Sequence, residues 1–247
     1  MADASGHGRA QVVRAPCGST TQRQGRGHDS GDFMKRFVVG ISGASGMPLA
    51  VTLLRGLRAA ARALPGQPDL PGRPDLAGES DLSGGVQVHL VVSDAARQVL
   101  ALESDLRAED LLALADVVHD ARDFGAPPSS GSWPHDGMVV CPCSMSTLAA
   151  IAHGTGSNLL HRAADVTLKE RRPLVLVVRE TPLSRVHLRN MLAAAEAGAV
   201  IMPPCPGFYA RPARVQDILD HLAGRILDQI GVPNALAARW GEAAERE

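Results

Sequence analysis

A run of five aliphatic residues, Leu174 to Val178, constrains the fold of this chain more than any other segment. Pro173 opens the run and Arg179-Glu180-Thr181-Pro182 closes it. A strand in which every side chain is apolar suits the centre of a parallel sheet, where helices cover both faces. Ligands of open α/β sheets bind beyond the carboxyl ends of the strands. Arg179 and Glu180 are therefore candidates for work on an anionic substrate that needs a proton moved, and an exposed ion pair is the alternative.

Strand and helix patterns alternate along most of the chain. Strands are expected at Phe37–Ile41, Val86–Val92, Val117–His119, Gly137–Cys141, Leu174–Val178 and Ala199–Met202. Helices are expected at Pro48–Arg62, from a cap at Asp94, from about Ser144, at Asn158–Glu170, at Ser184–Ala197 and at Val215–Ile230. This alternation predicts an α/β fold of three layers, Rossmann-like, with a six-stranded parallel sheet flanked by helices.

Composition excludes several classes of protein. The chain has 247 residues, 45% of them hydrophobic, which is enough for one sizeable core. A net charge of -1 does not favour nucleic acid or an anionic membrane surface as a partner. No apolar run approaches the roughly 20 residues of a membrane span, and we expect no signal peptide. The cysteines, Cys17, Cys141, Cys143 and Cys205, form no disulfide framework and no metal-binding pair of pairs, so we expect a cytoplasmic protein without a metal.

Two segments lack the periodicity of helices and strands. Residues 1–34 are rich in Gly, Ser, Arg and Gln and are expected to form a disordered N-terminal extension, with Met34 as an alternative start to Met1. Residues 64–85 are rich in Pro and Gly and contain a degenerate six-residue repeat that begins at Gly66. A solenoid would need more repeats, so we expect an exposed insertion into a single domain that spans 35–247.

Small and hydroxylated residues gather where three of the expected strands end. Gly40 to Gly46 follows the first strand and opens a helix, which suits a phosphate or another anion, although the glycine spacing matches no nucleotide-binding motif. Ser93 follows the second strand and suits either helix capping or ligand binding. Ser144 and Thr147 follow the fourth strand, one helical turn apart, and suit a phosphate or a ribityl chain. These strand ends together predict one crevice lined with hydroxyls and backbone amides.

The ordered set of motifs resembles the flavin prenyltransferases. This family was long described as aromatic-acid decarboxylases and shares its flavoprotein fold with cysteine decarboxylases. The resemblance covers about Arg36 to Trp240, apart from the insertion. The motifs that carry it are Gly43-Ala44-Ser45-Gly46, Ser93-Asp94-Ala95-Ala96, Cys141-Pro142-Cys143-Ser144-Met145, Asn158 to Val166, Leu168 to Arg172, Arg179-Glu180-Thr181-Pro182 and Gly207-Phe208-Tyr209.

The resemblance implies two substrates and a set of residues for each. Reduced FMN becomes prenylated FMN, and the residues implied to bind it are Gly43, Ala44, Ser45, Ser93, Ser144, Met145, Ser146, Thr147 and Arg179. The prenyl donor is dimethylallyl phosphate, and the residues implied to bind it are Lys169, Arg179, Tyr209, Arg225, Arg162 and Trp240. The implied catalytic residues are Glu180, Ser45 and Lys169, with no metal.

Taken without the resemblance, four of these residues have ordinary roles. Lys169 lies in a charged run typical of a solvated helix end, and Arg225 lies within a helix, where a surface position is the default. Tyr209 suits a structural role, and Trp240 suits an anchor for the C-terminal tail.

The resemblance also implies partners. Members of the family form homo-oligomers, often dodecamers, with sites at subunit interfaces, and they supply a decarboxylase that uses the prenylated flavin. That decarboxylase acts either in the ubiquinone pathway or on aromatic acids. Both a monophosphate and a diphosphate donor fit the sequence.

Two other functions fit the same fold. A flavin-dependent cysteine decarboxylase would carry a histidine on the first helix, and Pro48–Arg62 contains none. Its turn after the fourth strand also differs from Pro142–Thr147. A non-catalytic FMN-binding protein would have no use for the implied donor-binding residues.

Overall fold

The computed structural model describes residues 34–62, 85–237 and 239–240, which all belong to one compact unit, Gly31–Glu247. The expected N-terminal extension and the expected insertion lie outside the described residues, apart from Met34 and Gly85. Within this part of the chain, no helix is long and apolar enough to cross a membrane.

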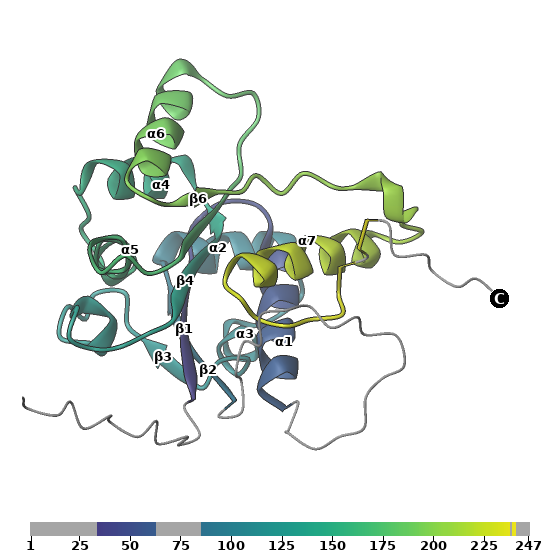
Figure 1. Cartoon of the computed structure of the whole chain (residues 1–247), viewed down its shortest axis with the longest axis horizontal. Coiled ribbons are helices and arrows are strands. Elements are labelled where there is room, and N and C mark those ends of the chain that lie inside the picture. The colour runs from purple at the N-terminus through teal and green to yellow at the C-terminus, as the bar shows by residue number, and fades with distance from the viewer. Residues whose placement is uncertain (1–33, 63–84, 238, 241–247) are drawn as a thin grey trace, which may run out of the picture. The chain divides into compact units, whose positions relative to one another are not determined.

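The centre of the unit is a sheet of six strands in the order β3-β2-β1-β4-β5-β6, and every pairing in it is parallel (Figure 1). The strands are β1 (Lys35–Ile41), β2 (Val86–Val92), β3 (Val117–His119), β4 (Gly137–Cys143), β5 (Leu174–Val178) and β6 (Val200–Ile201). The fold expected from the sequence is thus confirmed. All five residues of β5 are buried, as expected for a strand that is covered on both faces.

Helices connect the strands. They are α1 (Met47–Arg62), α2 (Asp94–Glu103), α3 (Ala108–Leu112), α4 (Met145–His153), α5 (Leu159–Lys169), α6 (Arg185–Glu196) and α7 (Val215–Gln229), with short 3-10 helices η1 (Pro127–Ser129) and η2 (Phe208–Ala210). Asn158 and Ser184 cap α5 and α6 as expected. The cap of α2 is Ser93 rather than Asp94, because the Ser93 hydroxyl accepts a hydrogen bond from the Ala96 amide.

Two hydrophobic clusters lie on opposite faces of the sheet. Alternate residues of β1 divide between them, with Phe37 and Val39 on one face and Val38 on the other. The first cluster includes buried side chains of α1, α2, α3 and α7, and the second includes those of α4, α5 and α6. In Figure 1, α4, α5 and α6 lie to the left of the sheet, and α1, α3 and α7 lie to its right.

The carboxyl ends of four strands lie along one edge of the sheet. Ile41 at the end of β1 pairs with Val92 at the end of β2, and Cys143 at the end of β4 pairs with Val178 at the end of β5. The turns that follow these four strands are therefore neighbours. This edge is where an open α/β sheet binds its ligand.

Candidate active site

Ser42 joins the turn after β1 to the turn after β4. Its side chain is buried, and its hydroxyl donates to the carbonyl of Pro142 at 2.9 Å. The same hydroxyl accepts from the amide of Ser144 at 2.8 Å. Both hydrogen-bonding directions of this hydroxyl are thus used between two strand ends that are 102 positions apart in the sequence. Ser42 therefore fixes the geometry of the crevice, and sequence reasoning did not single it out.

Gly43 lets the turn after β1 pack against the start of α2. A Cβ atom on Gly43 would lie 2.4 Å from the Cβ of Ala95, which is closer than real Cβ contacts. The turn that carries Ala44 and Ser45 is consequently held next to the turn that carries Ser93. This close packing explains why position 43 is a glycine, whether or not a ligand binds there.

Glu103, the last residue of α2, occupies the N-terminus of α1. Its Oε2 accepts hydrogen bonds from the amides of Gly46 and Met47, both at 2.9 Å. Burial alone would raise the pKa of this carboxyl, but the hydrogen bonds from Ser45, Gly46 and Met47 and the charge of Arg179 hold it below its usual value. A carboxylate of the protein itself therefore lies at the N-terminus of α1, where a negative charge is favourable.

The turn after β4 is organised by Ser144, which caps α4. Its hydroxyl accepts from the amide of Thr147 at 3.2 Å and donates to the Thr147 hydroxyl at 3.1 Å. Thr147 is buried, while Ser146 between them is exposed and Met145 is half-buried. The start of α4 therefore offers backbone amides and the Ser146 side chain to the edge of the sheet.

Arg179 and Glu180 follow β5 and are both exposed. The amide of Arg179 donates to the carbonyl of Cys143 at 3.1 Å, which ties the end of β5 to the end of β4. Glu180 accepts a hydrogen bond from the amide of Thr181 at 3.1 Å. The structure thus brings Arg179 and Glu180 to the same edge as the three hydroxyl-bearing turns.

Lys169 and Arg162 lie on α5, which ends just before β5 begins. Lys169 is the last residue of that helix and forms an ion pair with Glu170. Arg162 donates to the carbonyl of Ser129 at 3.1 Å and pairs with Asp165 at 2.6 Å. Because β5 lies between them, Lys169 and Arg179 lie at opposite edges of the sheet, and a five-residue strand spans roughly 16 Å.

A third group of the expected residues lies in the C-terminal segment. The Tyr209 ring meets the Trp240 ring edge-on, with centroids 5.1 Å apart. Arg225 is exposed on α7 and pairs with Asp228 at 2.8 Å. Asp228 also binds both terminal nitrogens of Arg239, at 2.6 and 2.9 Å, which holds the C-terminal residues against α7. Within one chain, the expected donor-binding residues therefore lie in three groups. Arg179 follows β5, Arg162 and Lys169 lie on α5, and the C-terminal segment carries Tyr209, Arg225 and Trp240.

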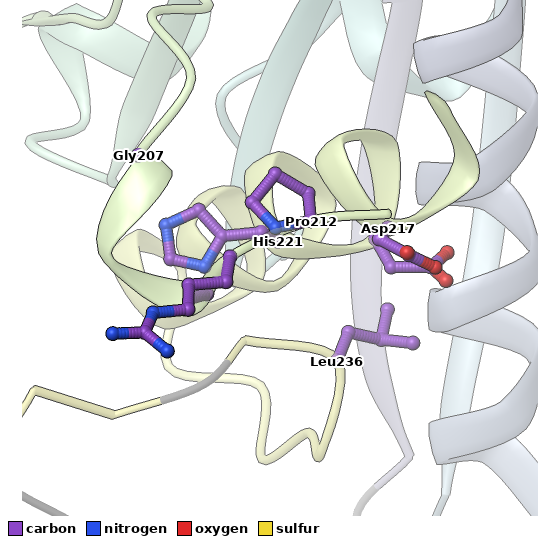
Figure 2. A pocket seen from close by; sticks show the side chains of 8 residues that line it. Gly207, Pro212, Asp217, His221 and Leu236 are labelled. Atoms are coloured by element: carbon purple, nitrogen blue, oxygen red, sulfur yellow. The ribbon is translucent and has the colours of Figure 1, made fainter. Parts of the chain in front are cut away.

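A cavity of about 260 Å³ lies beside this third group (Figure 2). The residues that line it are Gly207, Ala210, Arg211, Pro212, Asp217, Asp220, His221 and Leu236. His221 on α7 has an Nδ1 atom that is buried and lacks a hydrogen-bond partner, the one such side-chain atom found among the described residues. The sequence alone did not point to this cavity.

Cys141 and Cys143 do not form a metal-binding pair. The register of β4 shifts between Val140 and Cys143, and the two cysteines join the clusters on opposite faces of the sheet. Burial raises the pKa of the Cys143 thiol to about 12. Within 34–62, 85–237 and 239–240, no group of three or more His, Cys, Asp or Glu residues is placed to hold a metal ion.

Comparisons with known proteins agree with this geometry. The family model described as Flavoprotein matches residues 74–227. Flavin prenyltransferase UbiX of Escherichia coli (strain K12) is 50% identical over 209 residues, which cover 84% of this chain and 98% of that protein.

Two solved structures have the same fold. The crystal structure of AnUbiX in complex with FMN and dimethylallyl pyrophosphate gives a TM-score of 0.73 at 43% identity, covering 84% of this chain and 98% of that one. A dodecameric FMN-dependent Ubix-like decarboxylase from Escherichia coli O157:H7 gives 0.71 at 44% identity, covering 83% and 98%. The chain therefore belongs to the flavin prenyltransferases, within the wider Flavoprotein family, and the resemblance of its motifs is confirmed.

Proposed function

We propose that this chain transfers a dimethylallyl group from dimethylallyl phosphate to N5 and C6 of reduced FMN and so makes prenylated FMN. The observation that carries the proposal is the row of four strand-end turns in a member of the flavin prenyltransferases. When bound, the reduced flavin supplies the nucleophile, and the protein supplies binding, orientation and charge.

The strand-end turns fit a flavin mononucleotide. Ser45, Ser93 and Ser144 are half-buried and offer hydroxyls to one edge of the sheet. Because Glu103 fills the N-terminus of α1, we place the FMN phosphate at the start of α4. The proposed FMN-binding residues are Gly43, Ala44, Ser45, Ser93, Ser144, Met145, Ser146, Thr147 and Arg179.

The donor needs its leaving phosphate neutralised and its allyl cation stabilised. The proposed phosphate-binding residues are Lys169, Arg162, Arg179, Tyr209 and Arg225. Cationic side chains and a phenol stabilise a departing phosphate through charge-assisted hydrogen bonds. Trp240, which is 81% exposed, offers an aromatic face to the allyl cation. Glu180 is the proposed acid and base, and Ser45 is proposed as a second catalytic residue.

We further propose that the donor site forms between copies of this chain. Lys169 and Arg179 are separated by β5 in one chain, so a phosphate bound by both needs two chains. Helix α6 supports an assembly, because Val186, Leu188 and Leu192 are 61%, 51% and 60% exposed along it. The relative from Escherichia coli O157:H7 is described as dodecameric, and we propose a dodecamer here.

The product serves a decarboxylase that depends on prenylated FMN, either in the ubiquinone pathway or acting on aromatic acids. We place the enzyme in the cytoplasm, where the free thiols of Cys141, Cys143 and Cys205 stay reduced.

The test is anaerobic incubation of the protein with FMN, dithionite and dimethylallyl phosphate, followed by mass spectrometry of the released flavin. We expect a flavin heavier by one C5H8 unit, and a rate lower by about 100-fold in Glu180→Gln or Lys169→Ala. Arg171→Gln, an exposed cation in the same charged run, serves as the matched control and should keep the rate. Unmodified FMN with both the monophosphate and the diphosphate donor would contradict the proposal.

A further inference from the structure

His221 holds the Tyr209 side chain through two contacts. The Nε2 atom of His221 lies 3.3 Å from the Tyr209 hydroxyl oxygen. The two rings also meet edge-on, with centroids 5.3 Å apart and planes at 83°. Since Trp240 meets the same tyrosine ring at 83°, Tyr209 is fixed between two aromatic neighbours.

Gly207 makes room for this pair. A Cβ atom at position 207 would lie 2.8 Å from Cε1 of Tyr209 and 3.2 Å from Nε2 of His221. Any side chain there would therefore push the tyrosine ring away from the histidine. The absence of a side chain at 207 is a second and independent feature that preserves the contact.

The surroundings of Nδ1, the other ring nitrogen of His221, indicate which tautomer is present. Nδ1 is buried and has no partner among the described residues, although it lies in a residue that lines the cavity in Figure 2. An unpaired buried N–H is rarer in proteins than an acceptor with unused capacity. Nδ1 is then the bare acceptor and Nε2 carries the hydrogen. In that tautomer Nε2–H donates to the Tyr209 oxygen, and the tyrosine hydroxyl is itself a donor.

We propose that His221 is a positioning residue for prenyl transfer: its Nε2–H orients the Tyr209 hydroxyl so that it donates to the leaving phosphate of the allyl donor. Arg225 follows His221 by one helical turn, so the two residues lie on the same side of α7. The inference rests on the proposed function, because it assumes that Tyr209 contacts the donor.

Three substitutions of His221 distinguish the contribution of its Nε2–H from that of its ring. Gln at 221 retains a donor near the position of Nε2, Asn retains one near Nδ1, and Phe retains only the ring. We expect His221→Phe and His221→Asn to lower kcat/KM for dimethylallyl phosphate roughly tenfold, the size of one hydrogen bond to a charged group, and His221→Gln to restore most of it. Each variant is first checked for an unchanged melting temperature and unchanged FMN binding.

A double-mutant cycle with Tyr209→Phe tests whether His221 acts through the tyrosine. We expect His221→Phe to cause little further loss once the hydroxyl is gone, because the two residues act as one unit. Additive losses, or equal losses in the Gln and Asn variants, would show that His221 has only a structural role. Either result overturns the inference while wild-type turnover still supports the proposed function.

Tyr209 is the only tyrosine in the chain, which allows a readout that is independent of turnover. The tyrosine doublet in the Raman spectrum reports whether the hydroxyl donates or accepts a hydrogen bond. We expect the doublet to change in His221→Phe and in Gly207→Ala, and to return toward the wild-type ratio in His221→Gln. An unchanged doublet in His221→Phe would overturn the inference even if the wild type makes no prenylated flavin.

Discussion

At the scale of single residues, side chains of the protein bind several of the backbone groups that a ligand could have used. Glu103 accepts hydrogen bonds from the amides of Gly46 and Met47 at the start of α1, and the Ser42 hydroxyl links the turn after β1 to the turn after β4. Such contacts hold the crevice in shape before any flavin binds, so that less ordering remains at the moment of binding. The geometry of the strand-end turns is therefore set by the protein's own side chains.

Glu103 provides the first prediction at this scale. Glu103→Ala leaves the amides of Gly46 and Met47 without their acceptor and removes a negative charge from a helix N-terminus. We expect the free energy of unfolding to fall by about 2 kcal/mol. Urea unfolding at constant protein concentration measures it, with the exposed Glu109→Ala on α3 as a control. Equal stability of the two variants would mean that the carboxylate does not hold the turn.

Glu103 also shows what the sequence alone could not predict. It lies 57 positions from Gly46, and nothing in its neighbourhood marks it as the cap of a distant helix. Ser93 was predictable as a strand-end hydroxyl, and its choice over Asp94 as the cap depends on local backbone geometry. Local signals therefore predicted the turns, while the contacts between turns required the fold.

At the scale of elements, a layer of three histidines covers the face of β2 and β3 toward α5. The histidine layer consists of His89, His119 and His135. Nδ1 of His89 lies 2.9 Å from Nε2 of His119, and the Trp133 ring packs against the rings of His89 and His135. Arg172 donates to Nδ1 of His135 at 2.7 Å, and Nε2–H of His135 donates to the Thr167 hydroxyl at 2.9 Å. Both ring nitrogens of His135 are satisfied only in the neutral form.

The histidine layer predicts a loss of stability in acid. Burial and the charge of Arg172 lower the pKa of His135 to about 4. Burial and the charges of His119 and Arg36 lower the pKa of His89 to about 4, although the charge of Asp116 acts to raise it. In the unfolded chain these histidines keep the ordinary pKa of 6.5. As the pH falls from 6.5 toward 4, the unfolded chain therefore binds protons that the folded chain does not bind. We expect about 2 kcal/mol of lost stability per histidine across this window.

Urea unfolding at a series of pH values checks this dependence. His135→Gln keeps hydrogen-bonding capacity and cannot titrate, so its free energy of unfolding should vary less between pH 6.5 and 4. His187→Gln, on α6 and outside the histidine layer, should follow the wild type. A His135→Gln variant with the full wild-type slope would contradict the assignment.

At the scale of the whole molecule, the order of strands and helices followed from the aliphatic runs and their caps, as β5 and Asn158 illustrate. The sequence also placed Arg179 and Glu180 at a strand end. The expected order of a helix at Asn158–Glu170 and then a strand at Leu174–Val178 already implies that Lys169 and Arg179 lie at opposite ends of that strand. This separation is why we propose that the donor site forms between chains.

That arrangement predicts complementation between inactive variants. When Lys169→Ala and Arg179→Ala chains are co-expressed, some sites combine Lys169 of one chain with Arg179 of another, and both residues there are wild type. Random mixing in equal amounts should restore about a quarter of the wild-type prenylation rate in a closed assembly. The mass-spectrometric assay of flavin product measures it.

The matched control uses two residues that every site takes from one chain. Arg179→Ala and Glu180→Gln lie next to each other after β5, so no mixture of these chains can contain a site with both residues intact. Recovery in the first mixture and none in the second would place Lys169 and Arg179 on different subunits of one site. No recovery in either mixture, from assemblies of normal size, would mean that Lys169 and Arg179 act within one chain. The length of β5, roughly 16 Å, would then exclude a phosphate bound by both residues.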